Sequence, residues 1–378
     1  MEIVDIDGIY CNGIKKEQGL GIVKCKGVVA GVFTKNKLRS ASVEVCKEHV
    51  SDGYIEGLIV NSGTANAYTG ENGINDAKEV CKLFSKLLNC NERDVAIAST
   101  GIIGRRIDVG WIKNNLPSVY KGIGNTKLHA NRFANAITTT DRFPKKSYSN
   151  KIAISAVAKG AGMIAPNMST MLCFIFTTAK FDSGELHEML KSAVDNTFNM
   201  LTVDGDTSPN DTVLLISNQK DRVERDIFEA ELEKVCYNIA KMIAKDGEGS
   251  TKVFEVEVTG AKSFEDAKIA AKSIASSLLV KTAIFGNDPN WGRIIAALGY
   301  SGALVKHELS LSFESKNECV KLIEKGKRLE NEGEAKKFLE RNNEFKIKID
   351  LHLGDSHARA IGCDLTHDYV KLNSEYTS

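Results

Sequence analysis

Apolar residues recur at helical spacing in four stretches of the chain. In residues 74–89 they return every three or four positions, so they share one face and predict an amphipathic helix. The longest such pattern covers residues 226–245 and stops shortly before Gly247, a residue type that commonly follows a helix C-terminus. Residues 263–281 and 334–341 show the same period, and each is predicted to be helical.

Other apolar stretches predict β-strands. The last of them alternates apolar and polar residues strictly, which buries one face and leaves the other in water. The predicted strands are 56–61, 152–158, 171–178, 212–217, 253–259, 308–313 and 345–352. Helices and strands intermix along the chain without a proline-rich linker. We therefore expect an α/β or α+β fold with tightly packed domains and sheets covered by helices on one side.

Composition excludes several classes of function. The 378 residues hold 50 Lys and Arg against 49 Asp and Glu, so the formal net charge is only +1. This balance predicts neither nucleic acid nor a membrane surface as partner. No run approaches the ~18 apolar residues of a membrane span, and the N-terminus lacks a secretory signal. The nine cysteines are scattered without C-x-x-C pairs, as is typical of reduced thiols, so we expect a cytoplasmic protein.

Common catalytic signatures are absent from the sequence. It contains no G-x-S-x-G elbow, no H-E-x-x-H pair and no phosphate-binding P-loop. KGIGNT at 121–126 lacks the full dinucleotide pattern, and the seven histidines are dispersed. Nothing in these patterns points to a metal enzyme or to a histidine-driven hydrolase.

The segment 154–178 allows two interpretations. It places Lys159 and two glycines before Ser169 and Thr170, and an apolar strand follows at once. The segment is either a glycine-rich turn that leads into a buried strand, or a site of self-cleavage. In the second interpretation the Thr170 hydroxyl attacks the Ser169 carbonyl, and the freed α-amine becomes the base of the nucleophile, with a pKa of about 7.7–8.0.

A nucleophile of this kind needs a stabiliser for the oxyanion that it creates. Thr100 and Gly101 stand at the end of a short apolar run, in the sequence AIASTGIIGR. A hydroxyl and a backbone N–H at such a strand end form a suitable donor pair. The motif alone is a weak signal, and it gains weight as a partner for Thr170.

Together these blocks resemble the ornithine acetyltransferase family, also known as the glutamate N-acetyltransferase or ArgJ family of arginine biosynthesis. The resemblance keeps the order of the family over nearly the whole chain. The matching blocks are NSGTANAYTG at 61–70, STGIIGR at 99–105, TTTDRFPK at 138–145, KGAGMIAPNMSTML at 159–172, TVDGDTSPNDT at 202–212, AKDGEGSTK at 244–252, GNDPNWGR at 286–293 and the terminal YVKLNSEYTS.

The resemblance implies a fold and a processing event. Members of the family adopt a mixed-sheet α/β sandwich covered by helices, which is shared with DmpA-like aminopeptidases. They cleave themselves before a threonine, here Thr170, so we expect an N-terminal chain of residues 1–169 and a C-terminal chain of residues 170–378. The cleaved chains are expected to associate as a heterotetramer with two copies of each.

The resemblance also implies roles for single residues. Thr170 is expected to carry the acetyl group, and Thr100 and Gly101 to form the oxyanion hole. The expected substrate-binding residues are Thr139, Lys159, Thr170, Glu248, Asn373 and Ser378. The chain departs from the family pattern at Ser169, where alanine is usual, and at Ser378, where threonine also occurs. Both departures keep a small or hydroxyl-bearing side chain, so we expect cleavage and binding to persist.

The implied reaction moves the acetyl group from N2-acetyl-L-ornithine to L-glutamate through an acetyl-threonine intermediate, with ping-pong kinetics. We expect Lys159 to pair with a substrate carboxylate and Glu248 with the ornithine ammonium. Some members also use acetyl-CoA to acetylate glutamate, and the sequence leaves this open. Two other functions remain as alternatives: an amidase or aminopeptidase with the same N-terminal threonine, and an uncleaved amino-acid-binding protein on the same scaffold.

Overall fold

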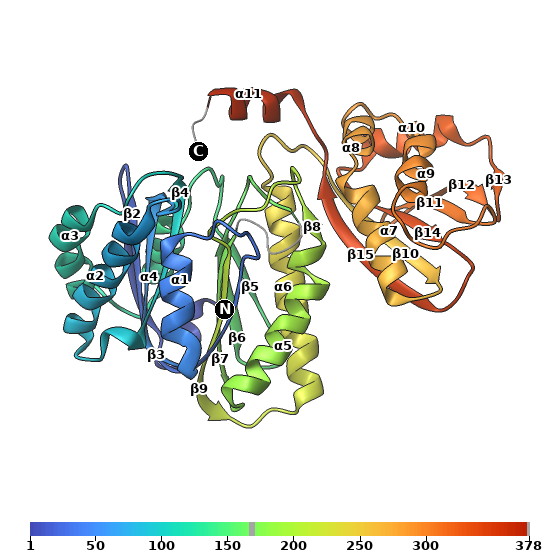
Figure 1. The fold of residues 1–378 in the computed structure, drawn as a ribbon. Helices are drawn as coiled ribbons and strands as arrows, with labels where there is room; N and C mark the ends of the chain where they lie inside the picture. Colours follow the sequence, from blue (N-terminus) through green and yellow to red (C-terminus); the bar gives the residue numbers. More distant parts are fainter. Residues whose placement is uncertain (166–170, 376–378) are drawn as a thin grey trace.

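The computed structural model describes residues 1–165 and 171–375, which form two sheets that lie side by side (Figure 1). The first sheet has the strand order β4-β3-β2-β9-β7-β6-β5, and β1 pairs with β2. Its strands are β1 (Tyr10–Lys15), β2 (Gly19–Phe33), β3 (Tyr54–Thr64), β4 (Val95–Ile102), β5 (Lys145–Tyr148), β6 (Ile154–Lys159), β7 (Leu172–Ala179) and β9 (Thr212–Asp221). The pairs β3–β4 and β7–β9 are parallel, whereas β1–β2, β2–β3, β2–β9, β5–β6 and β6–β7 are antiparallel.

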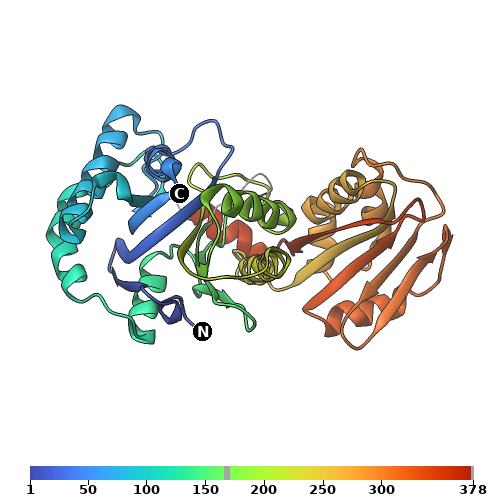
Figure 2. The ribbon, with the colours of Figure 1, turned by 90° about the horizontal axis from the view of Figure 1, so that it is seen from below.

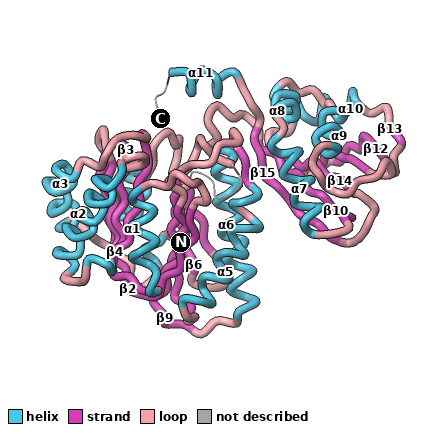
Figure 3. The backbone as a smooth tube through the Cα atoms, in the orientation of Figure 1, coloured by secondary structure: helices cyan, strands magenta, loops and turns pink. Residues whose placement is uncertain are grey.

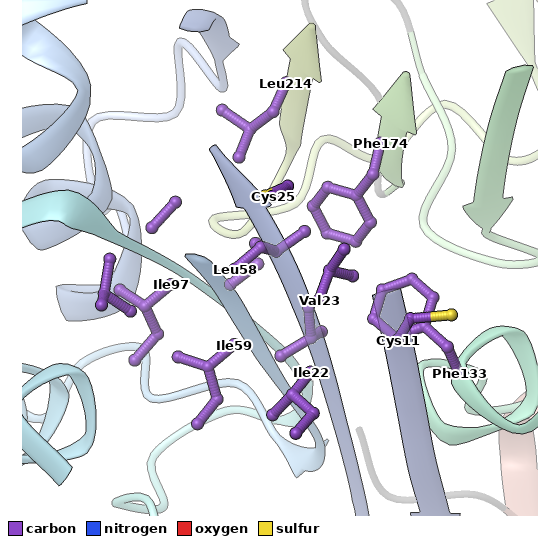
Figure 4. Close-up of a cluster of buried hydrophobic side chains, with 14 of the residues drawn as sticks. Cys11, Ile22, Val23, Cys25, Leu58, Ile59, Ile97, Phe133, Phe174 and Leu214 are labelled. Atoms are coloured by element: carbon purple, nitrogen blue, oxygen red, sulfur yellow. The ribbon is translucent and has the colours of Figure 1, made fainter. Parts of the chain in front are cut away.

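Helices cover both faces of the first sheet. One apolar core packs on both faces of β3 and β4, because neighbouring residues such as Leu58 and Ile59 both belong to it, and part of it is shown in Figure 4. A second core lies between one face of β6, β7 and β9 and two long helices. The helices of this half are α1 (Ala41–His49), α2 (Gly70–Leu88), α3 (Val109–Lys121), α4 (Lys127–Ala136), α5 (Ser183–Asn196) and α6 (Arg225–Lys245).

Strand β7 shows why this sheet is covered on both faces. Its side chains alternate between the two cores, with Phe174 and Phe176 in one and Cys173 and Ile175 in the other. A continuous apolar run of this kind is typical of a strand without a wet face. The expectation that helices cover the sheets on one side is therefore wrong for the first sheet.

The second sheet has the order β13-β12-β11-β14-β10-β15-β8 and buries one face under its helices. Figure 3 separates its strands from the helices that pack on them. Its strands are β8 (Leu201–Thr202), β10 (Val253–Ala261), β11 (Ser310–Glu314), β12 (Cys319–Glu324), β13 (Lys327–Arg328), β14 (Glu344–Asp350) and β15 (Ser356–Cys363). Its helices are α7 (Phe264–Ser276), α8 (Leu278–Phe285), α9 (Trp291–Gly299) and α10 (Glu332–Arg341). The last helix, α11 (His367–Glu375), follows β15.

The expected mixed α/β architecture with helix-covered sheets is confirmed, and each predicted helix or strand has a counterpart. One boundary is wrong, because the helix predicted over 263–281 is two helices, α7 and α8. The backbone of Ser277 is extended there (φ −66°, ψ 116°), and its hydroxyl caps α8 by accepting the Val280 N–H. No helix within the described ranges is long and apolar enough to cross a membrane.

Two segments of the chain connect the first sheet to the second. The segment between α6 and β10 leads from the first sheet to the second, and β8 extends the second sheet beside β15. Helix α11 then leaves β15 and runs back toward the first sheet (Figures 1 and 2). Loops from both sheets therefore meet at one end of the first sheet.

Candidate active site

One pocket gathers the predicted site residues that the structure describes. It lies where β4 and β6 end, and the segment before β10 and helix α11 close its other side. Its predicted lining residues are Thr100, Gly101, Thr139, Lys159, Glu248 and Asn373. The remaining predicted residues, Ser169, Thr170 and Ser378, lie outside the described residues. The pocket is also lined by Ile103, Thr140, Gly162, Met163, Ser208 and Asn210, which the sequence analysis did not single out.

The end of β4 is shaped by close backbone packing. Gly101 has φ +132°, and a Cβ on it would lie 2.3 Å from the carbonyl carbon of Gly63 in β3. Only glycine fits there. The Asn210 amide holds the strand end in place, because it donates to the carbonyls of Ser99 (2.8 Å) and Ala65 (2.6 Å). The sequence thus fixes the orientation of the peptide units around Thr100.

Lys159 lies at the end of β6 and is buried between two hydroxyls. Its Nζ donates to Thr139 Oγ1 at 2.8 Å and to Thr100 Oγ1 at 3.2 Å. Because Thr100 Oγ1 accepts this hydrogen bond, its own proton remains free to be donated. Burial lowers the pKa of Lys159, and the negative charge of Asp141 opposes that shift. The arrangement places a cation and a hydroxyl donor side by side.

Asp141 organises the surroundings of Lys159 and was not predicted as a site residue. Its Oδ1 accepts the Gly160 N–H at 2.6 Å, and its Oδ2 accepts the Thr139 N–H at 3.0 Å and lies 3.9 Å from Lys159 Nζ. Burial raises the pKa of Asp141, but Lys159 and Lys145 outweigh burial and hold it at about 2. The carboxylate therefore stays ionised and fixes the backbone on both sides of the pocket.

A buried ionic cluster extends from Asp141 to the segment before Glu248. Lys145 Nζ lies 2.5 Å from Asp141 Oδ1 and 2.6 Å from Asp246 Oδ2, and the three side chains have no exposed surface. Arg142 adds a contact from its Nε to Asp246 Oδ1 at 2.8 Å. This cluster ties the loop of residues 139–145 to residues 246–248.

Glu248 lines the pocket from the segment before β10. The described residues include no ion pair to its carboxylate, and its Oε2 accepts a hydrogen bond from Asn373 Nδ2 at 2.9 Å. Gly162 leaves room for it, because a Cβ there would lie 2.4 Å from the carboxyl group. The pocket therefore contains both a carboxylate, from Glu248, and an ammonium group, from Lys159.

Comparisons with known proteins give a consistent assignment. The model of the ArgJ family matches residues 7–378. The chain is 61% identical to the arginine biosynthesis bifunctional protein ArgJ of Archaeoglobus fulgidus over the full length of both. It is 46% identical to the glutamate N-acetyltransferase of Methanosarcina mazei, covering 100% of this chain and 98% of that one. A solved chain of the Bacillus halodurans bifunctional protein argJ matches with a TM-score of 0.50 and 40% identity, covering 54% of this chain and 98% of its own.

Proposed function

The chain belongs to the ArgJ family, and from that premise we propose that it is a glutamate N-acetyltransferase that takes the acetyl group from N2-acetyl-L-ornithine. The observation that carries the proposal is the single pocket that joins Thr100, Lys159 and Glu248. A hydroxyl donor, a cation and a carboxylate are the groups needed to bind an acetylated amino acid with a carboxylate and an ammonium. No cofactor is needed, because the acetyl donor is itself an amino acid.

Thr170 is proposed as the nucleophile that self-cleavage creates. Its hydroxyl attacks the carbonyl carbon of Ser169, the peptide C–N bond breaks as the hydroxyl proton passes to the nitrogen, and water hydrolyses the resulting ester. The product has a free amine and a free hydroxyl on Thr170. The placement of the described chain supports this role, because Leu172, two residues later, pairs with Lys159 in the β6–β7 ladder.

Acetyl transfer then proceeds in two half-reactions. The Thr170 hydroxyl attacks the acetyl carbonyl, its proton passes through the α-amine to the leaving nitrogen, and ornithine departs. The α-amine of glutamate attacks the acetyl ester and leaves as N-acetylglutamate, which restores the hydroxyl. In both steps the Thr100 hydroxyl and the Gly101 N–H are proposed to stabilise the oxyanion.

Lys159 and Glu248 are proposed to select the substrates. Lys159 binds a substrate carboxylate, and Asn373 holds the Glu248 carboxylate toward the ornithine ammonium. Glu248→Gln removes the charge, and we expect it to raise KM for acetylornithine about 10- to 100-fold. This factor corresponds to the loss of a hydrogen bond between charged groups, which contributes ~1.5–3 kcal/mol. KM for glutamate should not rise, since glutamate has no distal ammonium. An unchanged KM for acetylornithine in steady-state assays would refute this role.

Cleavage between Ser169 and Thr170 would leave interlocked pieces. Strand β6 of residues 1–169 pairs with β7 of residues 170–378, and β2 pairs with β9 in the same way. We further propose a cytoplasmic assembly with two copies of each piece. Helix α11 supports an association, because none of its residues is buried and its Val370 is 62% exposed.

The decisive experiment is a denaturing intact-mass spectrum of the freshly expressed protein beside Thr170→Ala. We expect pieces of 169 and 209 residues from the native sequence and one full-length chain from the variant. An intact chain in both samples would overturn the mechanism and favour the amino-acid-binding alternative. Acetyl release to water in the absence of glutamate, at the rate seen with glutamate, would instead favour an amidase.

A further inference from the structure

One loop holds the chain on both sides of the proposed cleavage site. The loop of residues 203–211 connects β8 to β9, and the motif TVDGDTSPNDT covers residues 202–212. At its start, the Val203 N–H donates to the Ile164 carbonyl at 2.7 Å. Directly after its end, the Thr212 N–H donates to the Met171 carbonyl at 3.1 Å. The described residues that flank positions 166–170 are thus fixed to the same loop.

Two aspartates of this loop strengthen the attachment. On the N-terminal side of positions 166–170, the backbone is held by Asp204. Its carboxylate accepts the Met163 N–H at 2.6 Å and the Ile164 N–H at 2.8 Å, with one oxygen for each. Met163 has φ +57°, a left-handed conformation that a residue with a side chain seldom adopts. The carboxylate therefore holds the backbone in a bend that the sequence alone would not favour.

On the C-terminal side of positions 166–170, Asp211 contacts Met171. Its Oδ1 accepts the Met171 N–H at 3.1 Å, and the side chain is fully buried. Burial raises the pKa of Asp211 well above its ordinary value, although the Met171 N–H and the nearby Lys159 charge oppose the shift. An asparagine at this position would keep the shape of the side chain and an oxygen that can accept the Met171 N–H.

We propose that Asp204 and Asp211 are positioning residues for self-cleavage, which anchor the chain before and after the Ser169–Thr170 bond. This inference rests on the proposed function of Thr170. The Met171 nitrogen is bonded to the carbonyl carbon of Thr170, and the two Cα atoms are ~3.8 Å apart. Holding the Met171 N–H therefore restricts where the backbone of the nucleophile can lie, and restricted geometry is what favours an intramolecular attack. Asp204 fixes the chain on the other side at Met163 and Ile164, and Ile164 stands five residues before Ser169.

The test compares rates of self-cleavage in a cell-free translation system, with a pulse of labelled amino acid followed by denaturing electrophoresis. Asp211→Ala removes the contact to Met171, and we expect cleavage to slow at least 10-fold. Asp211→Asn keeps an oxygen that accepts the same N–H, so its rate should stay within about threefold of the native sequence. Asp204→Ala should slow cleavage as Asp211→Ala does.

Glu231→Gln is the matched control for the loss of a buried carboxylate. Glu231 is 3% exposed and accepts a hydrogen bond from the Ser149 hydroxyl at 2.7 Å. Ser149 directly follows the C-terminal end of β5, which is the end remote from the pocket. The Glu231→Gln variant should cleave at the native rate. Thermal unfolding of each variant, measured in the uncleaved Thr170→Ala background, checks that the fold persists. If Asp211→Ala does not fold, Asp204→Asn replaces it, because Asp204 accepts N–H groups with both of its oxygens and an amide can accept with only one.

The outcomes separate this inference from the proposed function. Slow cleavage in the alanine variants with rescue by Asp211→Asn supports the positioning role. Native rates in both alanine variants overturn it while leaving Thr170 as the nucleophile. An Asp211→Asn variant as slow as Asp211→Ala also overturns it, because an oxygen that accepts the Met171 N–H would then not be enough for fast cleavage. Absence of cleavage in the native sequence refutes the proposed function itself.

Discussion

Replacing Lys145 by methionine removes the buried cation that joins Asp141 to Asp246. Methionine has a similar length and fills the same space, so the change isolates the charge. At an effective dielectric constant of ~20, a contact of 2.6 Å between Lys145 and Asp246 corresponds to roughly 6 kcal/mol of attraction. The contact to Asp141 is of the same order.

The net effect is smaller than the sum of these attractions. Dehydration of the buried ammonium costs several kcal/mol, and both carboxylates keep other partners. Arg142 stays on Asp246 at 2.8 Å, and the Gly160 N–H stays on Asp141 at 2.6 Å. We therefore expect Lys145→Met to lower the free energy of unfolding by about 3–5 kcal/mol, the usual cost of leaving one partner of a buried ion pair unpaired.

The assay is urea unfolding followed by far-UV circular dichroism, in the Thr170→Ala background so that every sample is one chain. Lys346→Met is the control, because Lys346 pairs with Glu257 at 2.9 Å but is 42% exposed, and exposed pairs contribute little. Adding Asp141→Asn to Lys145→Met should restore part of the loss, since it removes one unpaired charge. A Lys145→Met loss no larger than that of Lys346→Met would refute the reasoning.

Three further predictions concern the candidate active site and the ionic cluster beside it. The pKa of Asp141 is lowered from 3.8 to about 2, so the ionised carboxylate stabilises the fold above pH 4, and this stabilisation is lost as the pH falls toward 2. Between pH 4 and pH 2 the free energy of unfolding, measured by urea titration, should therefore fall by about 2 kcal/mol more in the native protein than in Asp141→Asn. The same pH dependence in both proteins would contradict this. Gly101→Ala places a Cβ 2.3 Å from the backbone of β3, so we expect no cleaved product in intact-mass spectra, and normal cleavage would contradict the close packing. Gly162→Ala pushes on the Glu248 carboxyl and should raise KM for acetylornithine at least severalfold, whereas Gly299→Ala, with open space around it, should not.

Local sequence patterns were sufficient where one face of an element decides its structure. The pattern over 226–245 predicts α6 (Arg225–Lys245) to within one residue, because its apolar stripe packs on the first sheet. Strand β2 (Gly19–Phe33) escaped prediction, because glycines interrupt its apolar pattern. The sheet explains one of them, since a Cβ on Gly27 would lie 2.0 Å from the Ser217 carbonyl oxygen. That constraint comes from a strand almost two hundred residues away, so no local window contains it.

The family resemblance identified residues of the pocket from short motifs, and the structure brings Thr100, Thr139, Lys159 and Glu248 together from distant segments. Their catalytic roles stay predictions. The sequence by itself determined which side chains are available for the chemistry and the class of fold. Only the tertiary structure decided that Lys145 is buried between two carboxylates, one of them 101 residues away. The physical reason is that burial and charge pairing depend on distances in space, whereas helical and strand patterns depend on neighbours along the chain.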